Sequence, residues 1–266
     1  MLVASDFDGT LAPIVAEPER AAPLPAALMA LSTLAARPDF RVAIVSGRAL
    51  ADLRGRCPVP NCWYVGGHGN ETHSPDGGDD LTPAPMEGHA AIRERLQELA
   101  AELRRRLPDW PGTQLEVKPY SLAVHFRQAP QWAPAIRDAF SALAAQAPFR
   151  VLLGRQVVEL MPQNALTKGH AVLRLSHRLA CDLVFYFGDD ATDEDVFRLP
   201  HEHIIGVKVA HDESPGELTA ADFRLSSPAA VAAALVQIAT ERPAASPRPD
   251  KKSEKKKKLH VSAVQP

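Results

Sequence analysis

Short apolar runs, each ending near glycine, serine or an acidic residue, alternate along the chain with segments of helical spacing. The runs lie at residues 1–5, 40–46, 64–65, 183–187 and 204–209. Uninterrupted apolar runs are typical of strands that are buried on both faces of a parallel sheet. Between the first two runs, leucines recur every three residues, which predicts a helix over residues 25–36. This alternation predicts a doubly wound, Rossmann-like α/β fold.

The pattern changes between residues 80 and 163, where a helix followed by two strands occurs twice. We expect helices at residues 88–107 and 132–146, and strands at 113–118, 121–127, 149–153 and 156–161. The last two strands meet at Gly154-Arg155, and connections this short imply antiparallel pairing. We therefore predict a small α+β domain, residues 80–163, inserted into a core formed by residues 1–79 and 164–240.

Polar and apolar residues alternate along the predicted strands of this inserted domain. Apolar positions such as Leu115 and Leu122 point toward the helices, which leaves a polar sheet face on the other side. That face carries Glu116, Lys118, His125, Arg127 and Glu159. A solvated surface and a ligand-reading surface are both consistent with this pattern.

Composition supports a folded chain with a contrasting tail. The 266 residues are 45% hydrophobic and 23% charged, close to ordinary globular usage. Eight of the 30 basic residues but three of the 32 acidic ones lie in residues 241–266, so residues 1–240 carry a net charge of −7. We expect the Lys-rich tail to be disordered and solvated, and nucleic-acid binding through it is the weaker interpretation.

The sequence also bears on where the protein resides. It has no apolar stretch of about 18 residues and no secretory signal, so we expect no contact with a membrane. Three cysteines at no metal-like spacing fit a reducing cytoplasm. We expect a cytoplasmic monomer.

The strongest chemical signal is the run Asp6-Phe-Asp8-Gly9-Thr10, which directly follows the first predicted strand. Residues two apart near a strand end face the same side, so both carboxylates point to one place. Gly9 permits a sharp turn there. One carboxylate can then attack a substrate while the other moves a proton.

A second acidic cluster follows the strand at residues 183–187. It contains Asp189, Asp190 and Asp193. Because the carboxyl ends of parallel strands share one edge of a sheet, we expect this cluster to meet Asp6 and Asp8. So many carboxylates call for a hard divalent cation, and Mg²⁺ is the usual choice beside phosphate.

Two further segments supply groups that bind anions. Ser46-Gly47-Arg48 follows the second predicted strand and offers a hydroxyl and backbone amides near a helix start. Lys168 lies where the chain re-enters the core after the inserted domain. Together with the acids, these groups form the kind of site that phosphoryl transfer requires.

These four segments, in this order, resemble the haloacid dehalogenase-like phosphatases, and more closely the trehalose-6-phosphate phosphatase family. The resemblance extends to about residue 230, and the stretches in the inserted domain make it specific. Only five residues precede Asp6, fewer than the family pattern leads us to expect, and the tail lies outside that pattern. The matching stretches are DFDGTLAPI at 6–14, SGR at 46–48, GGHGNE at 66–71, LEVKPYSLAVHFR at 115–127, VELMP at 158–162, KG at 168–169 and GDDATDEDVF at 188–197.

The resemblance implies a haloacid dehalogenase-like core with an inserted cap, and a role for each matching residue. Asp6 is the implied nucleophile, and Asp8 the acid that protonates the leaving oxygen and then activates water. Mg²⁺ is held by Asp6, the Asp8 carbonyl and Asp189, supported by Asp190 or Asp193. The implied phosphate-binding residues are Thr10, Ser46 and Lys168. The implied sugar-binding residues are Glu116, Lys118 and Glu159, with Arg127, His68 and Asn164 as further candidates.

Other functions stay open at this point. A sucrose-phosphate phosphatase or a phosphomannomutase can share the core segments, and a mutase must retain its aspartyl-phosphate for a second transfer. A non-catalytic sugar-phosphate sensor can use the same fold, but we expect such a protein to have lost a nucleophile, a metal ligand or the lysine. Here all three are present.

Overall fold

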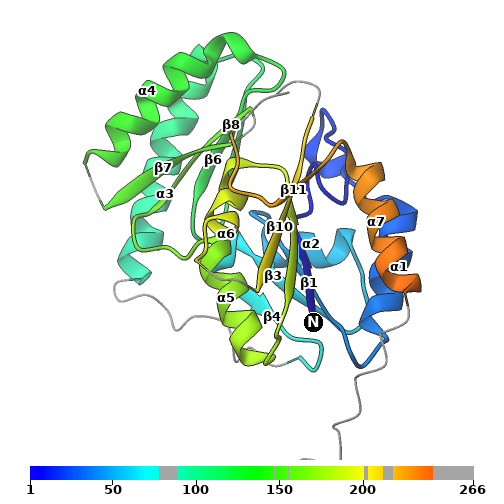
Figure 1. The fold of residues 1–266 in the computed structure, drawn as a ribbon. Coiled ribbons are helices and arrows are strands. Elements are labelled where there is room, and N and C mark those ends of the chain that lie inside the picture. Colours follow the sequence, from blue (N-terminus) through cyan, green and yellow to red (C-terminus); the bar gives the residue numbers. More distant parts are fainter. Residues whose placement is uncertain (78–88, 147, 155, 201–202, 212–217, 242–266) are drawn as a thin grey trace, which may run out of the picture.

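The computed structural model describes residues 1–77, 89–146, 148–154, 156–200, 203–211 and 218–241. Within these residues the chain forms a seven-stranded sheet and a four-stranded sheet, each with its own helices (Figure 1). None of the described helices combines the length and apolar character needed to cross a bilayer. The predicted α/β class with an inserted α+β domain is confirmed.

The seven-stranded sheet has the order β11-β10-β9-β1-β2-β3-β4. All neighbours are parallel except β4, which runs antiparallel to β3. β1 lies between β2 and β9, so the strand order reverses at the centre of the sheet. Its strands are β1 (Leu2–Ser5), β2 (Arg41–Val45), β3 (Cys62–Gly66), β4 (Glu71–His73), β9 (Val184–Gly188), β10 (Ile204–Val209) and β11 (Phe223–Leu225).

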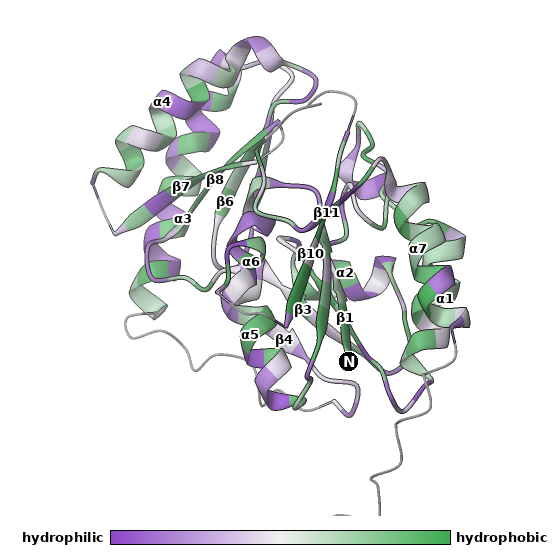
Figure 2. Ribbon diagram, in the orientation of Figure 1, coloured by the Kyte–Doolittle hydropathy of each residue, from purple (hydrophilic) through white to green (hydrophobic). Residues whose placement is uncertain are grey.

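The central strands are apolar on both faces, as the uninterrupted runs predict. In β1, Leu2 and Ala4 pack on one side of the sheet and Val3 on the other, and all three are fully buried. Central strands of this sheet, such as β1 and β10, are accordingly coloured as hydrophobic in Figure 2. This burial fixes the positions at which the central strands end, and therefore where the residues after them lie.

Helices cover both faces of this sheet. One apolar cluster joins α1, α2 and α7 to the sheet, and a second joins α5 and α6 to its other face. The predicted helix at 25–36 is observed as α1. The bounds are α1 (Pro25–Ala35), α2 (Leu50–Arg56), α5 (Lys168–Arg178), α6 (Glu194–Phe197) and α7 (Pro228–Thr240).

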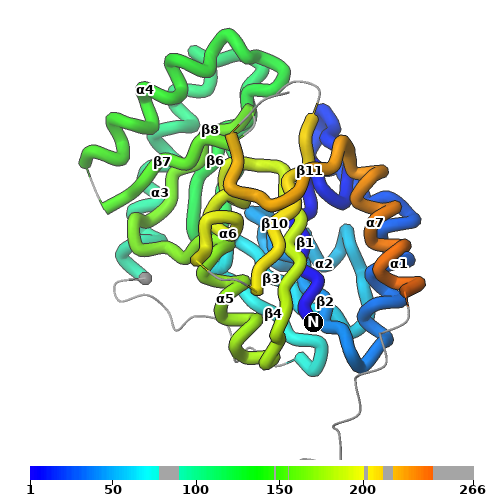
Figure 3. The backbone as a smooth tube through the Cα atoms, in the orientation of Figure 1, coloured from blue at the N-terminus to red at the C-terminus, as the bar shows by residue number. Residues whose placement is uncertain are grey.

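The inserted domain repeats one helix–strand–strand unit, as the sequence predicts. Its antiparallel sheet has the order β5-β6-β8-β7, and both helices pack on the apolar face to form a separate core. Figure 3 shows this part of the chain as one body beside the core. Its elements are α3 (His89–Arg106), β5 (Gln114–Val117), β6 (Leu122–His125), α4 (Ala133–Ala144), β7 (Phe149–Gly154) and β8 (Val157–Pro162).

The loop between β3 and β4 lies beside the segment that returns from the inserted domain. Asn70, just before β4, donates from Nδ2 to the Gly67 carbonyl at 2.6 Å. Its Oδ1 accepts from the backbone amide of Leu166 at 3.2 Å, and its Nδ2 lies 3.5 Å from the Leu166 carbonyl. One side chain thus joins the loop after β3 to the residues that precede α5.

Some predictions fall outside the described residues. The first domain boundary at residue 80, the turn residue Arg155 and the tail from residue 242 are among them, so these stay predictions. The second boundary, at 163–164, directly follows β8. The part of the chain that the structure describes also contains five short 3-10 helices: η1 (Pro18–Arg20), η2 (Gly67–Gly69), η3 (Leu107–Asp109), η4 (Pro130–Trp132) and η5 (Ala191–Asp193).

Candidate active site

Asp6 lies at the carboxyl end of β1 and is 4% exposed. Its amide donates to the Phe187 carbonyl of β9 at 2.8 Å, which fixes the backbone at this point. Lys168 donates from Nζ to Asp6 Oδ1 at 2.8 Å. Burial raises the pKa of Asp6 well above its usual range; Lys168 opposes the shift, and Asp193 adds to it. The acid therefore depends on nearby positive charge for its ionised form.

Lys168 is the first residue of α5 and is almost completely buried between two acids. It donates to Asp193 Oδ1 at 2.8 Å as well as to Asp6. Although burial lowers it, the two carboxylates raise the pKa of Lys168 above its usual range. The side chain therefore stays charged, as an anion-binding lysine must.

The second acidic cluster lies beside Asp6, as predicted from the shared sheet edge. Tyr186 donates from its hydroxyl to Asp193 Oδ1 at 2.6 Å, and the Asp190 amide donates to Asp193 Oδ2 at 2.9 Å. Asp189 is 3% exposed, and its Oδ2 lies 3.1 Å from His211 Nε2. Fixed by these contacts, the acids cannot turn away from one another.

This cluster has the chemistry of a divalent cation site. Single oxygens of Asp6, Asp189 and Asp193 all lie within 4.8 Å of one another, and all three residues are buried. Lys168 alone carries too little positive charge for three carboxylates. Hard oxygen ligands of this kind fit Mg²⁺. Burial also raises the pKa of Asp190, and Lys168 opposes that shift.

The turn after Asp6 brings β1 against the acidic cluster. Gly9 has a φ of +77°, and a Cβ atom there would lie 2.2 Å from Asp189 Oδ2. Thr10 is buried and donates to Asp189 Oδ1 at 3.2 Å. Since its hydroxyl is turned to Asp189 and it does not line the pocket, phosphate binding by Thr10 stays a prediction.

Ser46 and the loop after β3 form the next part of the site. Ser46 is 1% exposed, and its hydroxyl accepts from the Arg48 amide at 3.2 Å. His68 adopts a φ of +58° and donates from its amide to the Ser46 carbonyl at 3.0 Å. Its ring lies over Gly47, where a Cβ atom would come within 2.4 Å of it. The left-handed backbone of His68 thus turns its ring across Gly47.

His68 reaches across to the inserted domain. Its Nε2 lies 3.1 Å from Glu159 Oε2, whereas its Nδ1 is buried without a hydrogen-bond partner among the described residues. Lys118 donates to Glu159 Oε1 at 3.1 Å, and Ser121 donates to the same oxygen. Burial raises the pKa of Glu159, but Lys118 and His68 outweigh it and hold that pKa well below its ordinary value.

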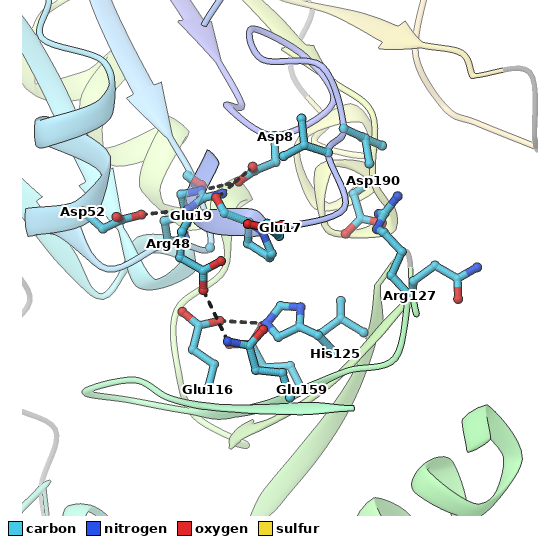
Figure 4. Close-up of a pocket in the computed structure, with 18 of the residues that line it drawn as sticks. Asp8, Glu17, Glu19, Arg48, Asp52, Glu116, His125, Arg127, Glu159 and Asp190 are labelled. Atoms are coloured by element: carbon cyan, nitrogen blue, oxygen red, sulfur yellow. Dashed lines mark hydrogen bonds and ion pairs between the residues drawn. The ribbon is translucent and has the colours of Figure 1, made fainter. Parts of the chain in front are cut away.

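Other polar residues of the inserted sheet face the core across a pocket of about 650 Å³ (Figure 4). Glu116 Oε2 lies 2.9 Å from His125 Nε2 and 3.8 Å from Lys118 Nζ. The polar sheet face is therefore turned to the pocket rather than to open solvent. The pocket-lining residues predicted from sequence are Asp6, Asp8, Ser46, His68, Glu116, Lys118, Arg127, Glu159, Lys168, Asp189 and Asp190.

Asn164 differs from these residues. It is exposed and does not line the pocket, so its sugar-binding role stays a prediction. The sequence reasoning also missed several groups. It used Arg48 only for its backbone amide, and it gave no part to Asp52, Arg56 or His211, although three of these side chains line the pocket: Arg48, Asp52 and Arg56. The charged residues at 48, 52 and 56 recur at helical spacing, a signal that could have found them.

Comparisons with known proteins agree with this geometry. A sequence model of the trehalose-phosphatase family matches residues 4–229. The chain is 41% identical over 237 residues to a trehalose-phosphate phosphatase of Mycobacterium tuberculosis, covering 85% of this chain. It spans 58% of the length of that relative.

Two solved structures have a similar fold. A trehalose-6-phosphate phosphatase related protein superposes with a TM-score of 0.72 at 22% identity, covering 90% of this chain and 97% of that one. The C-terminal domain of Candida albicans trehalose-6-phosphate phosphatase gives 0.70 at 23% identity, with 90% and 91% covered. At these identities the likeness concerns the fold alone.

Proposed function

The chain belongs to the trehalose-phosphatase family, and from this premise we propose that it hydrolyses trehalose 6-phosphate to trehalose and phosphate. The observation that carries the proposal is that one pocket is lined by both Asp6 with Lys168 and the polar face of the inserted domain. The first pair suits phosphoryl transfer and the second suits a polyhydroxylated sugar. We call the inserted domain the cap.

In the proposed reaction, Asp6 attacks phosphorus and the bond from phosphorus to the sugar oxygen breaks. Asp8 gives its proton to that oxygen. A water molecule then attacks the aspartyl-phosphate and passes its proton to Asp8, and the bond from Asp6 to phosphorus breaks. Asp6 and Asp8 thereby return to their starting states.

Positive charge must balance the phosphoryl oxygens throughout. Lys168 supplies part of it, and Ser46 with the following amides supplies hydrogen bonds. Asp6, Asp189 and the Asp8 carbonyl would hold Mg²⁺, with Asp190 or Asp193 in support. When bound, Mg²⁺ offsets negative charge on the phosphoryl group.

On the cap, the proposed sugar contacts come from Glu116, Lys118 and Glu159. Charged groups that are already paired and fixed can accept from and donate to hydroxyl groups with little further ordering. Arg127 and His68 line the same pocket and complete the proposed sugar site.

Phosphate release from a panel of sugar phosphates, with Mg²⁺ and with EDTA, tests the proposal. We expect a strong preference for trehalose 6-phosphate and loss of release in EDTA. Asp6→Asn should abolish turnover while the circular dichroism spectrum stays unchanged. A preference for sucrose 6-phosphate or hexose phosphates would support the proposed phosphatase reaction but contradict trehalose 6-phosphate as the substrate. No release from any ester would favour a sugar-phosphate sensor.

The sugar assignment makes a separate prediction for Glu116. Glu116→Ala should raise KM for trehalose 6-phosphate at least about tenfold, since charge-assisted hydrogen bonds contribute about 1.5–3 kcal/mol. The KM for 4-nitrophenyl phosphate, which lacks a sugar, should change less than about twofold. Equal changes for both substrates would show that Glu116 does not read the sugar.

A further inference from the structure

Arg48 engages both side-chain oxygens of Asp8. Its Nε donates to Asp8 Oδ2 at 2.6 Å, and its Nη2 donates to Asp8 Oδ1 at 2.7 Å. The guanidinium is thus paired with this carboxylate in the two-point geometry that is the strongest arrangement for such a pair. Nothing in the proposed reaction so far uses this side chain.

Arg48 is itself held from three other directions. It donates from Nη1 to Asp52 Oδ2 at 2.8 Å and from Nη2 to the Pro18 carbonyl at 2.8 Å. Its guanidinium carbon also lies 5.4 Å from the centre of the Phe7 ring. Figure 4 shows Arg48 between Asp8 and Asp52. With its side chain only 13% exposed, Arg48 has little freedom to move away from Asp8.

A second arginine fixes the support. Arg56 Nε donates to both oxygens of Asp52 at 2.7 and 2.8 Å, and its Nη1 donates to the Glu19 carbonyl in the rim of the pocket. Asp52 and Arg56 are one helical turn apart on α2. Arg56, Asp52 and Arg48 thus form a row of alternating charges that begins on α2, continues just before its first residue and ends on Asp8.

The pairing limits how Asp8 can move. Because one guanidinium holds both of its oxygens, the carboxyl group cannot rotate freely at the edge of the pocket. In the proposed reaction Asp8 gives its proton to the leaving oxygen, which requires the carboxyl group to be directed at that oxygen. Arg48 is placed to supply this alignment.

We propose that Arg48 is a positioning residue that aligns Asp8 and promotes proton donation to the leaving oxygen, with Asp52 and Arg56 holding Arg48 in place. This inference rests on the proposed function, because it requires Asp8 to be the acid of a phosphoryl transfer. If Arg48 acts in this way, its contribution to kcat/KM should be largest for substrates whose leaving group needs a proton to depart.

Two aryl esters of similar size test this dependence without sugar contacts. Phenolate leaves poorly and needs a proton, whereas 4-nitrophenolate leaves well without one. The ratio kcat/KM covers only the steps up to the first irreversible one, so hydrolysis of the aspartyl-phosphate does not enter. We expect Arg48→Gln to lower kcat/KM for phenyl phosphate about 10- to 100-fold, part of the contribution typical of general acids. For 4-nitrophenyl phosphate we expect less than about threefold.

A double-mutant cycle asks whether Arg48 acts through Asp8. In the Asp8→Asn background, Arg48→Gln should lower kcat/KM for phenyl phosphate by less than about twofold more. Arg48→Lys keeps the charge but loses the two-point pairing, so it should fall between wild type and Arg48→Gln. It also keeps the test open if Arg48→Gln fails to fold. Arg54→Gln, at an exposed position of α2, is the matched control and should leave the hydrolysis of both esters unchanged.

The outcomes separate the two proposals. Equal losses on both esters, no loss on either, or full additivity with Asp8→Asn would overturn the role of Arg48 and leave the proposed function intact. If the wild-type protein releases phosphate from neither aryl ester nor any sugar phosphate, the proposed function fails, and the role of Arg48 fails with it.

Discussion

At the scale of single residues, Gly9 illustrates how little space the acidic site leaves. It has a left-handed backbone, and any side chain there would meet the carboxylate of Asp189. Positive φ alone would favour glycine, but here the close contact adds a second and stronger constraint. The constraint falls on the carboxylate that, with Asp6, has the geometry of a cation site.

Gly9→Ala should therefore lower kcat/KM about 100-fold or more, because a displaced Asp189 no longer faces Asp6. The Mg²⁺ concentration for half-maximal activity should rise as well. Gly55→Ala is the control, since no atom lies within 4 Å of a Cβ placed on this helix. It should leave activity unchanged and raise the free energy of unfolding by about 0.4–1 kcal/mol. Unaltered Mg²⁺ dependence in Gly9→Ala would contradict this account.

Glu159 shows how a buried acid links stability to pH. Its pKa lies well below the ordinary glutamate value of 4.5, so its ionised form stabilises the fold above that pH. This stability is lost as the pH falls below about 4.5 and toward the lower pKa of the folded state.

Glu159→Gln removes the nearer of the two acids that face Lys118, leaving Glu116 at 3.8 Å, and should lower the free energy of unfolding at pH 7 by about 3 kcal/mol. The difference from wild type should narrow as the pH drops below 4.5. Urea unfolding at several pH values measures it. A difference that is constant between pH 7 and pH 3.5 would argue against an ionised Glu159 in the folded protein.

At the scale of elements, helix starts connect stability to the site. Thr167, the residue before Lys168, caps the start of α5: its side chain accepts a hydrogen bond from the His170 amide. Ser227 caps α7 in the same way by accepting from the Ala230 amide, but α7 carries none of the residues that line the pocket. The two caps therefore form a matched pair.

Thr167→Ala and Ser227→Ala should each lower the free energy of unfolding by about 1 kcal/mol. Only Thr167→Ala should also lower kcat/KM, about tenfold, because the first turn of α5 sets the aim of Lys168. Thermal unfolding and steady-state kinetics on both variants measure this. If both variants changed kcat/KM equally, the cap at the start of α5 would have no specific effect on the position of Lys168.

Elements also mark the limit of what the sequence predicts. Buried central strands such as β1 and β9 follow directly from apolar runs, and with them the meeting of Asp6 and Asp189. The edge strand β11 escapes prediction because it has only three residues and Phe223 is 60% exposed. The pairing of Arg48 with Asp8 escapes it too, since that contact depends on how closely the ends of β1 and β2 approach, which no local pattern encodes.

At the scale of the whole molecule, the cap has an apolar cluster separate from the two that flank the core sheet. Phe140 lies at the centre of the cap cluster and is fully buried. Polar contacts join cap and core, such as His68 with Glu159 and Gln114 with Glu19. We expect the cap to lose its structure separately from the core.

Phe140→Ala should lower the stability of the cap by about 3–5 kcal/mol while leaving the unfolding midpoint of the core unchanged. Tryptophans report on each part, since Trp110 and Trp132 lie in the cap and Trp63 in β3. In Trp63→Phe the tryptophan fluorescence reports on unfolding of the cap. In a variant with Trp110 and Trp132 replaced by Phe it reports on unfolding of the core. A single shared transition in both backgrounds would show that cap and core unfold together.

The separate apolar cluster of the cap has a consequence for how such proteins diversify. Because the cap is one contiguous stretch of the chain that packs on itself, it can be exchanged as a unit. A different module could be grafted at the same place without altering the catalytic half. New substrate ranges can then arise by exchanging one contiguous stretch of coding sequence, while the machinery that handles the phosphate is inherited intact.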